Sequence, residues 1–284
     1  MKKAIMHIIK GREKLIGKDE TVLQPLPHKD FRFANPFIVL HHMRPQKIEA
    51  GSAMRLHPHP HRGFAPVTFM LQGEGYHKDN AGHDETIREG DVQWMFAGRG
   101  ILHSEGPTKE MLATGGVQEL IQLWINVPAA HKWDKPSYQS AEKHQMPQVI
   151  QQDGVSMRLA SGTYDGYTGP MKTFTDIISI AGEIKKGARV QFNATPGYWT
   201  LLYVAKGKLC IDQEQVDQYN LVVFEKNNNE IIFSAEEDSI ILFLSAEPIN
   251  EPVAAKDNFV MNTQEEVEQA LVDYSKGVFG TLEY

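Results

Sequence analysis

Histidines concentrate in one part of this 284-residue chain, where eight of the twelve lie between His41 and His103. Two short signatures stand out, His-Pro-His at positions 59–61 and His-Ser-Glu at positions 103–105. Side chains two residues apart along a β-strand point to the same face, so His59 and His61 would share one face, and His103 and Glu105 another. Two such strands lining one barrel would bring three imidazoles and one carboxylate together.

This set of nitrogen and oxygen ligands is typical of a first-row divalent metal. Four protein ligands on an octahedral ion leave two positions for water, substrate or dioxygen. Any single histidine is more simply a surface or hydrogen-bonded residue, but the paired spacing favours a metal site. A second register stays open, in which His57 and His59 form the pair, because His57 has the same parity.

The residues from about Phe31 to Val127 predict the strands that would carry these groups. Short apolar runs alternate with glycine-rich turns, as in a β-sandwich or barrel. The runs span residues 36–40, 66–71, 91–96 and 120–125.

A second β-rich region, residues 173–245, repeats this pattern without the histidines, in runs at 200–205, 221–224, 230–233 and 239–244. When the regions are superposed without gaps, Asn193 and Thr195 take the places of His59 and His61. We therefore expect a metal-binding barrel over residues 1–130, a polar, proline-marked connector over 131–150, and a second barrel without a metal site within 151–284.

The end of the chain predicts one amphipathic helix. Residues 263–266, Thr-Gln-Glu-Glu, form a capping box. Apolar residues then recur at the spacing of one helical face, at Val267, Ala270, Leu271 and Tyr274. We expect this C-terminal helix to cover a sheet.

Composition and charge narrow the classes of function. The chain is 41% hydrophobic and 23% charged, which is ordinary for a globular protein. Its 29 basic and 36 acidic residues give a net charge of −7, which argues against direct nucleic-acid binding. Cys210 is the single cysteine and is expected in the core, and no run approaches the ~18 apolar residues of a membrane helix. We expect a cytoplasmic protein without a membrane span, and a monomer, because closed barrels leave few sheet edges.

Four strings in the sequence resemble the pirin family of bicupins: His-Pro-His-Arg-Gly-Phe at 59–64, Gly-Asp-Val-Gln-Trp-Met at 90–95, Ala-Gly-Arg-Gly-Ile-Leu-His-Ser-Glu at 97–105 and Phe-Val-Met-Asn-Thr at 259–263. The resemblance spans about residues 36–280. It implies an all-β fold of two cupin-type barrels, with one iron in the N-terminal barrel. The ligands that it implies are His59, His61, His103 and Glu105, and it favours this register over the pair His57 and His59.

The chain departs from the family pattern at two further places. Ala65-Pro66 stands where a glutamate is often found, which should alter the polarity of the pocket without loss of the metal. Lys256-Asp-Asn258 stands where a glycine-proline pair usually precedes the phenylalanine, so the local turn should differ.

Members of this family are described either as quercetin 2,3-dioxygenases or as iron-dependent transcriptional co-regulators. The first class predicts a dioxygenase acting on flavonol-like aromatics, in which Glu105 is both a metal ligand and the base for an enolic hydroxyl. The alternative is a non-enzymatic, redox-sensing regulator that binds a protein partner. Fe(II) follows from the resemblance and cellular availability, whereas the ligand set alone also accepts Mn, Co, Ni, Cu or Zn.

Other residues carry simpler expectations. His77 and His83 flank a turn and are expected in an exposed loop or at the pocket rim. Residues 94–96, Trp-Met-Phe, are expected in the barrel core, and the sharper alternative is a wall against an aromatic substrate. Arg62 could orient a ligand carboxylate or form a surface salt bridge. His41 and His42 could approach the pocket mouth and are assigned no role.

Overall fold

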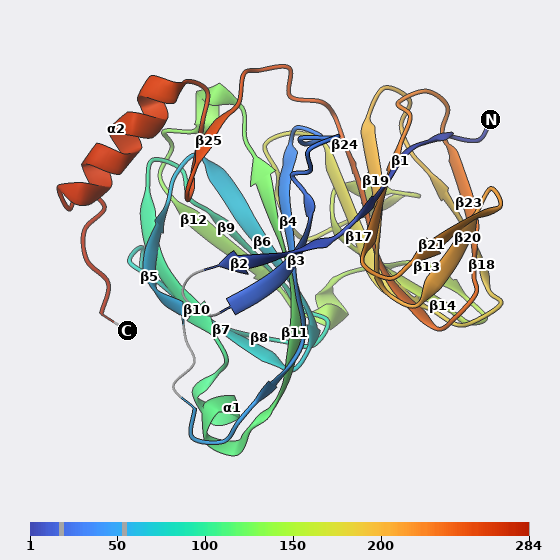
Figure 1. Ribbon diagram of the computed structural model, residues 1–284, viewed down its shortest axis with the longest axis horizontal. Coiled ribbons are helices and arrows are strands. Elements are labelled where there is room, and N and C mark those ends of the chain that lie inside the picture. Colours follow the sequence, from blue (N-terminus) through green and yellow to red (C-terminus); the bar gives the residue numbers. More distant parts are fainter. Residues whose placement is uncertain (17–19, 53–55, 284) are drawn as a thin grey trace. The chain divides into compact units, whose positions relative to one another are not determined.

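Strands from separate stretches of sequence assemble into two units in the computed structural model, which describes residues 1–16, 20–52 and 56–283 (Figure 1). The first unit comprises Leu15–Val22, Phe37–Lys143 and Ile249–Tyr284. The second comprises Met1–Lys14, Leu23–Pro36 and His144–Pro248. No helix in the described part of the chain is long and apolar enough to cross a membrane.

The candidate metal ligands belong to the smaller of two sheets that build the first unit. The larger sheet has seven strands, in the order β12 (Ser137–Ala141), β9 (Val92–Phe96), β6 (Phe64–Gln72), β11 (Gly116–Asn126), β4 (Phe37–Ile48), β3 (Glu20–Leu26) and β2 (Arg12–Ile16). The smaller, antiparallel sheet has four, in the order β5 (Leu56–His61), β10 (Ile101–Gly106), β7 (Glu74–Asp79) and β8 (Asp84–Arg88).

The second unit repeats this plan of one seven-stranded and one four-stranded sheet. Its larger sheet has the order β1 (Ile5–Lys10), β22 (Asn220–Phe224), β19 (Trp199–Lys206), β24 (Ser239–Ala246), β17 (Ile177–Ile184), β14 (Val155–Ser161) and β13 (Gln148–Gln152). Its smaller sheet has the order β18 (Arg189–Asn193), β23 (Glu230–Ala235), β20 (Lys208–Ile211) and β21 (Glu214–Asp217). Each of the eight apolar runs predicted from the sequence corresponds to one of these strands.

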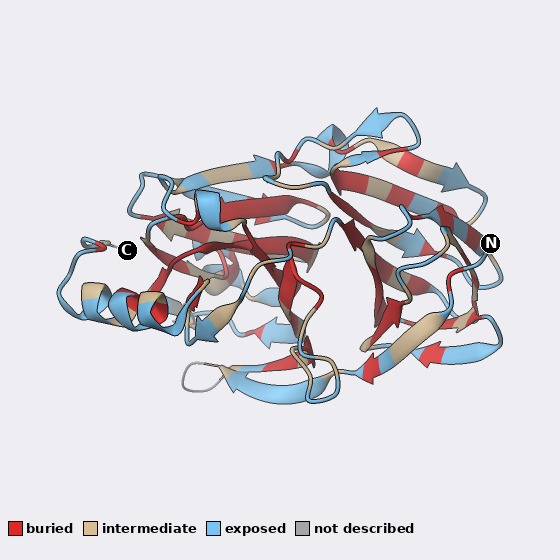
Figure 2. Cartoon of the chain, turned by 90° about the horizontal axis from the view of Figure 1, so that it is seen from above, coloured by how far each residue is buried: buried red, intermediate tan, exposed pale blue. Residues whose placement is uncertain are grey.

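Short elements connect the sheets. They are α1 (Lys109–Thr114), two 3₁₀ turns (Ala129–His131 and Lys143–Gln145), and two hairpins, β15 (Thr163–Tyr164) with β16 (Tyr167–Thr168) and β25 (Ala254–Lys256) with β26 (Phe259–Met261). Figure 2 shows buried residues concentrated along the strands and exposed residues in the connections.

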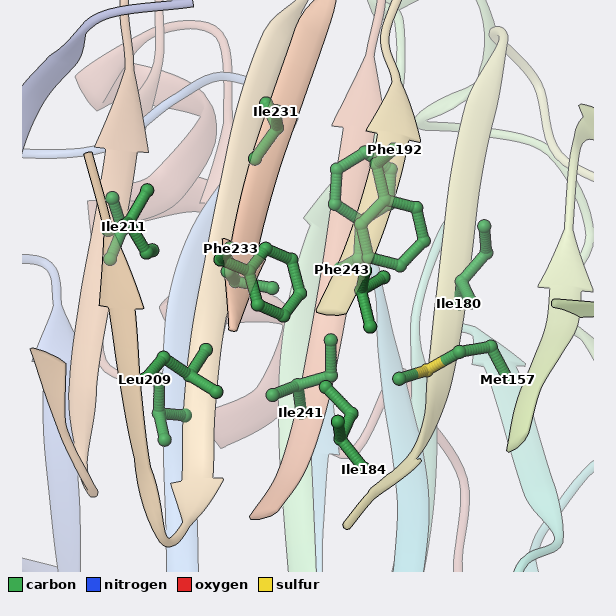
Figure 3. Packing of buried hydrophobic residues seen from close by; sticks show 14 of the residues in the cluster. Met157, Ile180, Ile184, Phe192, Leu209, Ile211, Ile231, Phe233, Ile241 and Phe243 are labelled. Atoms are coloured by element: carbon green, nitrogen blue, oxygen red, sulfur yellow. The ribbon is translucent and has the colours of Figure 1, made fainter. Parts of the chain in front are cut away.

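Apolar side chains fill the second unit between its sheets (Figure 3). Phe192 of β18 stacks on Phe243 of β24, with ring centroids 4.2 Å apart and planes within 8°. In strand order β18 and β23 correspond to β5 and β10, yet they contribute Phe192, Ile231 and Phe233 to a core where the first unit has its histidines. Such packing is stabilised by burial of apolar surface and needs no ligand.

The units differ from the predicted limits 1–130 and 151–284 at both ends of the chain. The opening run forms β1, which pairs with β22 of the second unit, because the edge of that sheet offers a partner for its backbone. The predicted connector contains β12, an edge strand that pairs with β9 of the first unit. Its short, polar sequence lacks the apolar alternation by which a strand is recognised.

The C-terminal helix α2 (Gln264–Ser275) belongs to the first unit (Figure 1). Thr263 and Glu266 form the predicted capping box: the Glu266 N–H donates to Thr263 Oγ1 at 3.2 Å, and the Thr263 N–H donates to Glu266 Oε2 at 3.0 Å. Val267 and Ala270 are buried in a cluster with Leu102, Phe259, Met261 and Phe279. The helix therefore packs on the β25–β26 hairpin and on Leu102 of β10, within the first unit.

Candidate metal centre

Strands β5 and β10 bring the histidines of the two signatures together. They pair antiparallel with His59 opposite His103 and His61 opposite Ile101, so the three histidine side chains share one face. The ring centroid of His103 lies 4.3 Å from that of His59 and 4.8 Å from that of His61. One nitrogen from each ring lies within 4.8 Å of the others, close enough for one metal ion to contact all three.

The Nδ1 atoms of the three rings are all engaged. His59 Nδ1 donates to the carbonyl of His57 at 2.9 Å, and His61 Nδ1 donates to the carbonyl of Asn258 at 3.3 Å. His103 Nδ1 lies 3.4 Å from Nδ1 of His77. In a neutral ring this leaves Nε2, which carries a lone pair, as the atom that can bind a metal.

His103 Nε2 is buried and has no hydrogen-bond partner among the described residues. A buried polar nitrogen of this kind is costly unless a ligand satisfies it. A divalent metal held by nitrogen ligands would do so, so the residues fit such an ion. The alternative pair, His57 with His59, does not form the cluster. His57 is exposed, and its carbonyl accepts a hydrogen bond from His59.

The surroundings hold two of the rings in the neutral form that a metal requires. Burial, followed by the proximity of His59, keeps the pKa of His61 well below its usual value. Burial and the neighbouring His59 and His61 lower the pKa of His103 in the same way. Both rings can therefore offer a lone pair at neutral pH without first losing a proton.

Glu105 is on the same strand but is not in the group of ligand atoms that lie within 4.8 Å of one another. The β-strand register shifts between His103 and Glu105. The Glu105 carboxylate accepts hydrogen bonds from Gln122 Nε2 at 3.1 and 3.0 Å. Gln122 Oε1 accepts the indole N–H of Trp124 at 3.3 Å, which orients the amide with its donors toward Glu105.

The carboxyl group of Glu20 interacts electrostatically with that of Glu105. Burial, and then the charge of Glu105, raise the pKa of Glu20 to about 7. Glu20 begins β3 of the same unit. This corner of the unit therefore carries negative charge that a cation would offset.

Two aromatic rings border His61. The centroids of Phe64 and Trp124 lie 5.1 and 5.6 Å from that of His61, and 4.4 Å from each other. The predicted wall at residues 94–96 is a buried strand, β9, with Trp94 paired to Val67. The aromatic groups beside the histidines are thus Phe64 and Trp124, and residues 94–96 take the core position of the simpler expectation.

Arg62 is buried and does not form the surface salt bridge considered from the sequence. Its Nη1 pairs with Asp273 Oδ2 of α2 at 2.7 Å, and its Nε donates to the carbonyl of Arg99 at 2.7 Å. Gly63 follows with a φ of +84°, and a Cβ there would collide with the backbone of Val260. The His-Pro-His-Arg-Gly string therefore both presents histidines and docks the C-terminal segment.

The structure corrects the expectation for His77. Strand β7 continues to Asp79, so His77 lies inside the sheet with its side chain fully buried. His83 remains at the edge, with 31% of its side chain exposed. His41 and His42 are buried on β4, and His42 Nε2 lies 2.9 Å from Glu119 Oε1.

Sequence reasoning missed Gln122, Asp79 and the carbonyl of Asn258. The signal for Gln122 is a polar residue within the apolar run 120–125, since a buried polar side chain requires a partner. Asp79 carries a weaker signal, because an aspartate before a turn is ordinary. Asn258 acts through its backbone, so its residue type offers no signal.

Comparison with known proteins supports the fold. The Pirin family matches residues 18–125, and the Pirin C-terminal cupin domain matches residues 180–280. A Pseudomonas aeruginosa protein named "Putative quercetin 2,3-dioxygenase" is 33% identical over 247 residues, covering 86% of each chain.

Two solved structures extend this result. A quercetin 2,3-dioxygenase from Acinetobacter baumannii superposes with a TM-score of 0.93 at 30% identity, covering 100% of both chains. An Escherichia coli bacterial pirin in complex with nickel(II) gives a TM-score of 0.66 at 20% identity over 86% of this chain and 99% of that one, a likeness in fold. The predicted all-β fold of two cupin-type barrels with a C-terminal helix is confirmed.

Proposed function

The chain belongs to the pirin family, and on that premise we propose that it is a metal-dependent dioxygenase acting on flavonol-like aromatic substrates. The metal ligands in this proposal are His59, His61, His103 and Glu105. The observation that carries it is the buried Nε2 of His103, which has no partner among the described residues and lies in the group formed with His59 and His61.

Each ligand has a defined role in this proposal. The three Nε2 atoms would hold the ion, because the Nδ1 atoms are engaged elsewhere. Bound Fe(II) would supply Lewis-acid and redox chemistry toward an enolic substrate and dioxygen. Iron is proposed from the family, while the nickel(II) of the Escherichia coli relative fits a donor set that accepts several divalent ions.

Glu105 is the group proposed to take the proton from the enolic hydroxyl of the substrate. Its carboxylate is held by the Gln122 amide, which donates to both oxygens and leaves further lone pairs free to accept. Gln122 therefore fixes the base in place, and Trp124 fixes Gln122. Positioning of this kind contributes because a base must lie within hydrogen-bonding reach of the proton that it removes.

The substrate class rests on two observations. Phe64 and Trp124 border His61 with aromatic surface, which suits a planar aromatic ring. The Acinetobacter baumannii and Pseudomonas aeruginosa relatives carry the name quercetin 2,3-dioxygenase. A flavonol such as quercetin is therefore the first substrate to test.

The test is oxygen uptake by the full chain, loaded with Fe(II) under anaerobic conditions and then mixed with quercetin and air-saturated buffer. We expect uptake by the wild type and by His144→Ala, a control that removes an exposed histidine of the second unit. We expect none from His59→Ala or His103→Ala. Metal-dependent capture of a protein partner without turnover would overturn the enzyme assignment in favour of the regulatory class.

A further inference from the structure

One of the three histidines is supported differently from the other two. His59 and His61 donate from Nδ1 to backbone carbonyls, which can only accept a hydrogen bond. His103 Nδ1 instead faces Nδ1 of His77 at 3.4 Å. An imidazole nitrogen can donate or accept, so this contact alone does not decide which nitrogen of His103 carries the proton.

The contact between His77 and Asp79 decides which nitrogen of His103 carries the proton. His77 Nε2 lies 3.1 Å from Asp79 Oδ2, and both side chains are fully buried. A carboxylate only accepts, so a neutral His77 ring donates from Nε2 and keeps a lone pair on Nδ1. That lone pair accepts the Nδ1 proton of His103, and His103 Nε2 remains free of hydrogen.

Asp79 is well suited to stay ionised. Its Oδ1 accepts the backbone N–H groups of Ala81 at 2.9 Å and His83 at 3.1 Å, and its Oδ2 lies 2.8 Å from Nδ1 of His83. Burial alone would raise the pKa of Asp79, but the hydrogen bonds from His77 and His83 outweigh it and lower that pKa to about 2. The carboxylate is therefore a permanent acceptor at neutral pH.

The geometry also restrains the His77 ring. Tyr138 of β12 stacks on it, with centroids 4.7 Å apart and planes inclined by 25°. The register of β7 against β10 places Asp79 opposite His103 and His77 opposite Glu105, so His77 and Asp79 share the face that carries the ligands. Rotation of the ring is thus limited by its neighbours on two sides.

We infer that Asp79 and His77 are positioning residues that set the tautomer of His103, so that its Nε2 lone pair points to the metal. The inference rests on the proposed function, since it takes His103 to be a metal ligand. Groups that hydrogen-bond to a ligand ring fix its orientation and tautomer, and their mutation costs about 10–100-fold in metal affinity. Here the partner of the ligand is a second imidazole, whose own tautomer is set by a carboxylate.

Asp79→Asn tests this inference because the amide has the shape of the carboxylate but places an N–H donor where the carboxylate has an acceptor. The backbone N–H groups of Ala81 and His83 require an acceptor, so the amide oxygen should take the place of Oδ1. The amide NH₂ then takes the place of Oδ2 and donates to His77 Nε2. His77 must now donate from Nδ1 to His103, which drives the His103 proton to Nε2 and blocks the metal-binding atom.

The primary measurement is the set of imidazole ¹⁵N chemical shifts in the metal-free full chain. We expect His103 to be the Nδ1–H tautomer in the wild type and the Nε2–H tautomer in Asp79→Asn. A Co(II) titration should show about 10–100-fold weaker binding in Asp79→Asn. Asp84→Asn, which changes an exposed carboxylate of the same hairpin, should match the wild type in both measurements.

Rescue separates positioning from a general loss of structure. His77→Asn in the Asp79→Asn background places an amide oxygen near the former ring Nδ1, where it can accept from His103 without reference to residue 79. We expect this double variant to regain the Nδ1–H tautomer and most of the Co(II) affinity.

Two results would overturn the inference: an Nε2–H tautomer of His103 in the wild type, or an unchanged tautomer in Asp79→Asn. A wild-type chain that has the expected tautomer but does not bind Co(II) would instead contradict the proposed function.

Discussion

Gln122 holds Glu105 by donating its amide to both carboxylate oxygens, at 3.1 and 3.0 Å. The Trp124 indole N–H occupies the amide oxygen of Gln122, so only donors face Glu105. This three-residue arrangement explains why a polar residue, Gln122, stands within the apolar run 120–125 of β11. A change at Gln122 would therefore alter the position of the Glu105 carboxylate and leave its charge in place.

Gln122 should contribute more to turnover than to metal binding. Gln122→Leu removes both hydrogen bonds from Glu105, so turnover of quercetin should fall about 10–100-fold, as for other residues that orient a site group. Iron content should change little, because the three histidines remain. Equal loss of iron and activity in Gln122→Leu would contradict the positioning role.

Glu20 predicts a pH dependence of the metal-free protein. Its folded-state pKa of about 7 is above the ordinary value of 4.5, so the folded chain keeps a proton that the unfolded chain releases between these values. Stability should therefore fall as pH rises from about 4.5 to 7. Glu20→Gln removes this loss and should be more stable than the wild type at pH 8 by roughly 1–3 kcal/mol.

Urea unfolding of the metal-free wild type and Glu20→Gln at several pH values checks this prediction. The gap between them should narrow as the pH is lowered toward 4.5. A gap that is the same at all pH values would show that ionisation of Glu20 is not its source.

The ion pair between Arg62 and Asp273 predicts a large effect on stability. The Arg62 side chain is 3% exposed, and its guanidinium also lies over the ring of Phe279, 4.5 Å from the centroid. Arg62→Met should reduce the free energy of unfolding by about 2–4 kcal/mol, because it removes a largely buried charge from its partners. Lys276→Met, at the exposed end of α2, is the control and should change it by less than about 0.5 kcal/mol.

Urea or thermal unfolding of the two variants measures this difference. An Arg62→Met variant as stable as the wild type would contradict the view that Arg62 anchors α2 to the strand that carries His59 and His61.

Local features could be predicted from the sequence, whereas features that depend on pairing between distant segments could not. The parity of His59 with His61 follows from strand geometry alone, and so does the capping box at Thr263. The exchange of β1 and α2 between the units could not be predicted, because pairing and packing partners far apart in sequence decide it. The same holds for β12, whose residues are recognisable as a strand only beside β9.

The support around the site shows the same division. His77 looks like a turn histidine in sequence, since Lys78 to Gly82 reads as a loop, and only the length of β7 buries it beside His103. Asn258 contributes a carbonyl, which every residue possesses. Candidate ligands can therefore be found from residue type and spacing, whereas the groups that orient them require the fold.

In the proposed site one metal ion is held by the Nε2 atoms of His59, His61 and His103. The iron content of the full chain, after anaerobic loading with Fe(II) and removal of unbound metal, tests this ligand set. The wild type and His144→Ala should each retain about one iron per chain, while His59→Ala and His103→Ala should lose most of it. Retention of iron by both of these variants, or its absence from the wild type, would contradict this ligand set.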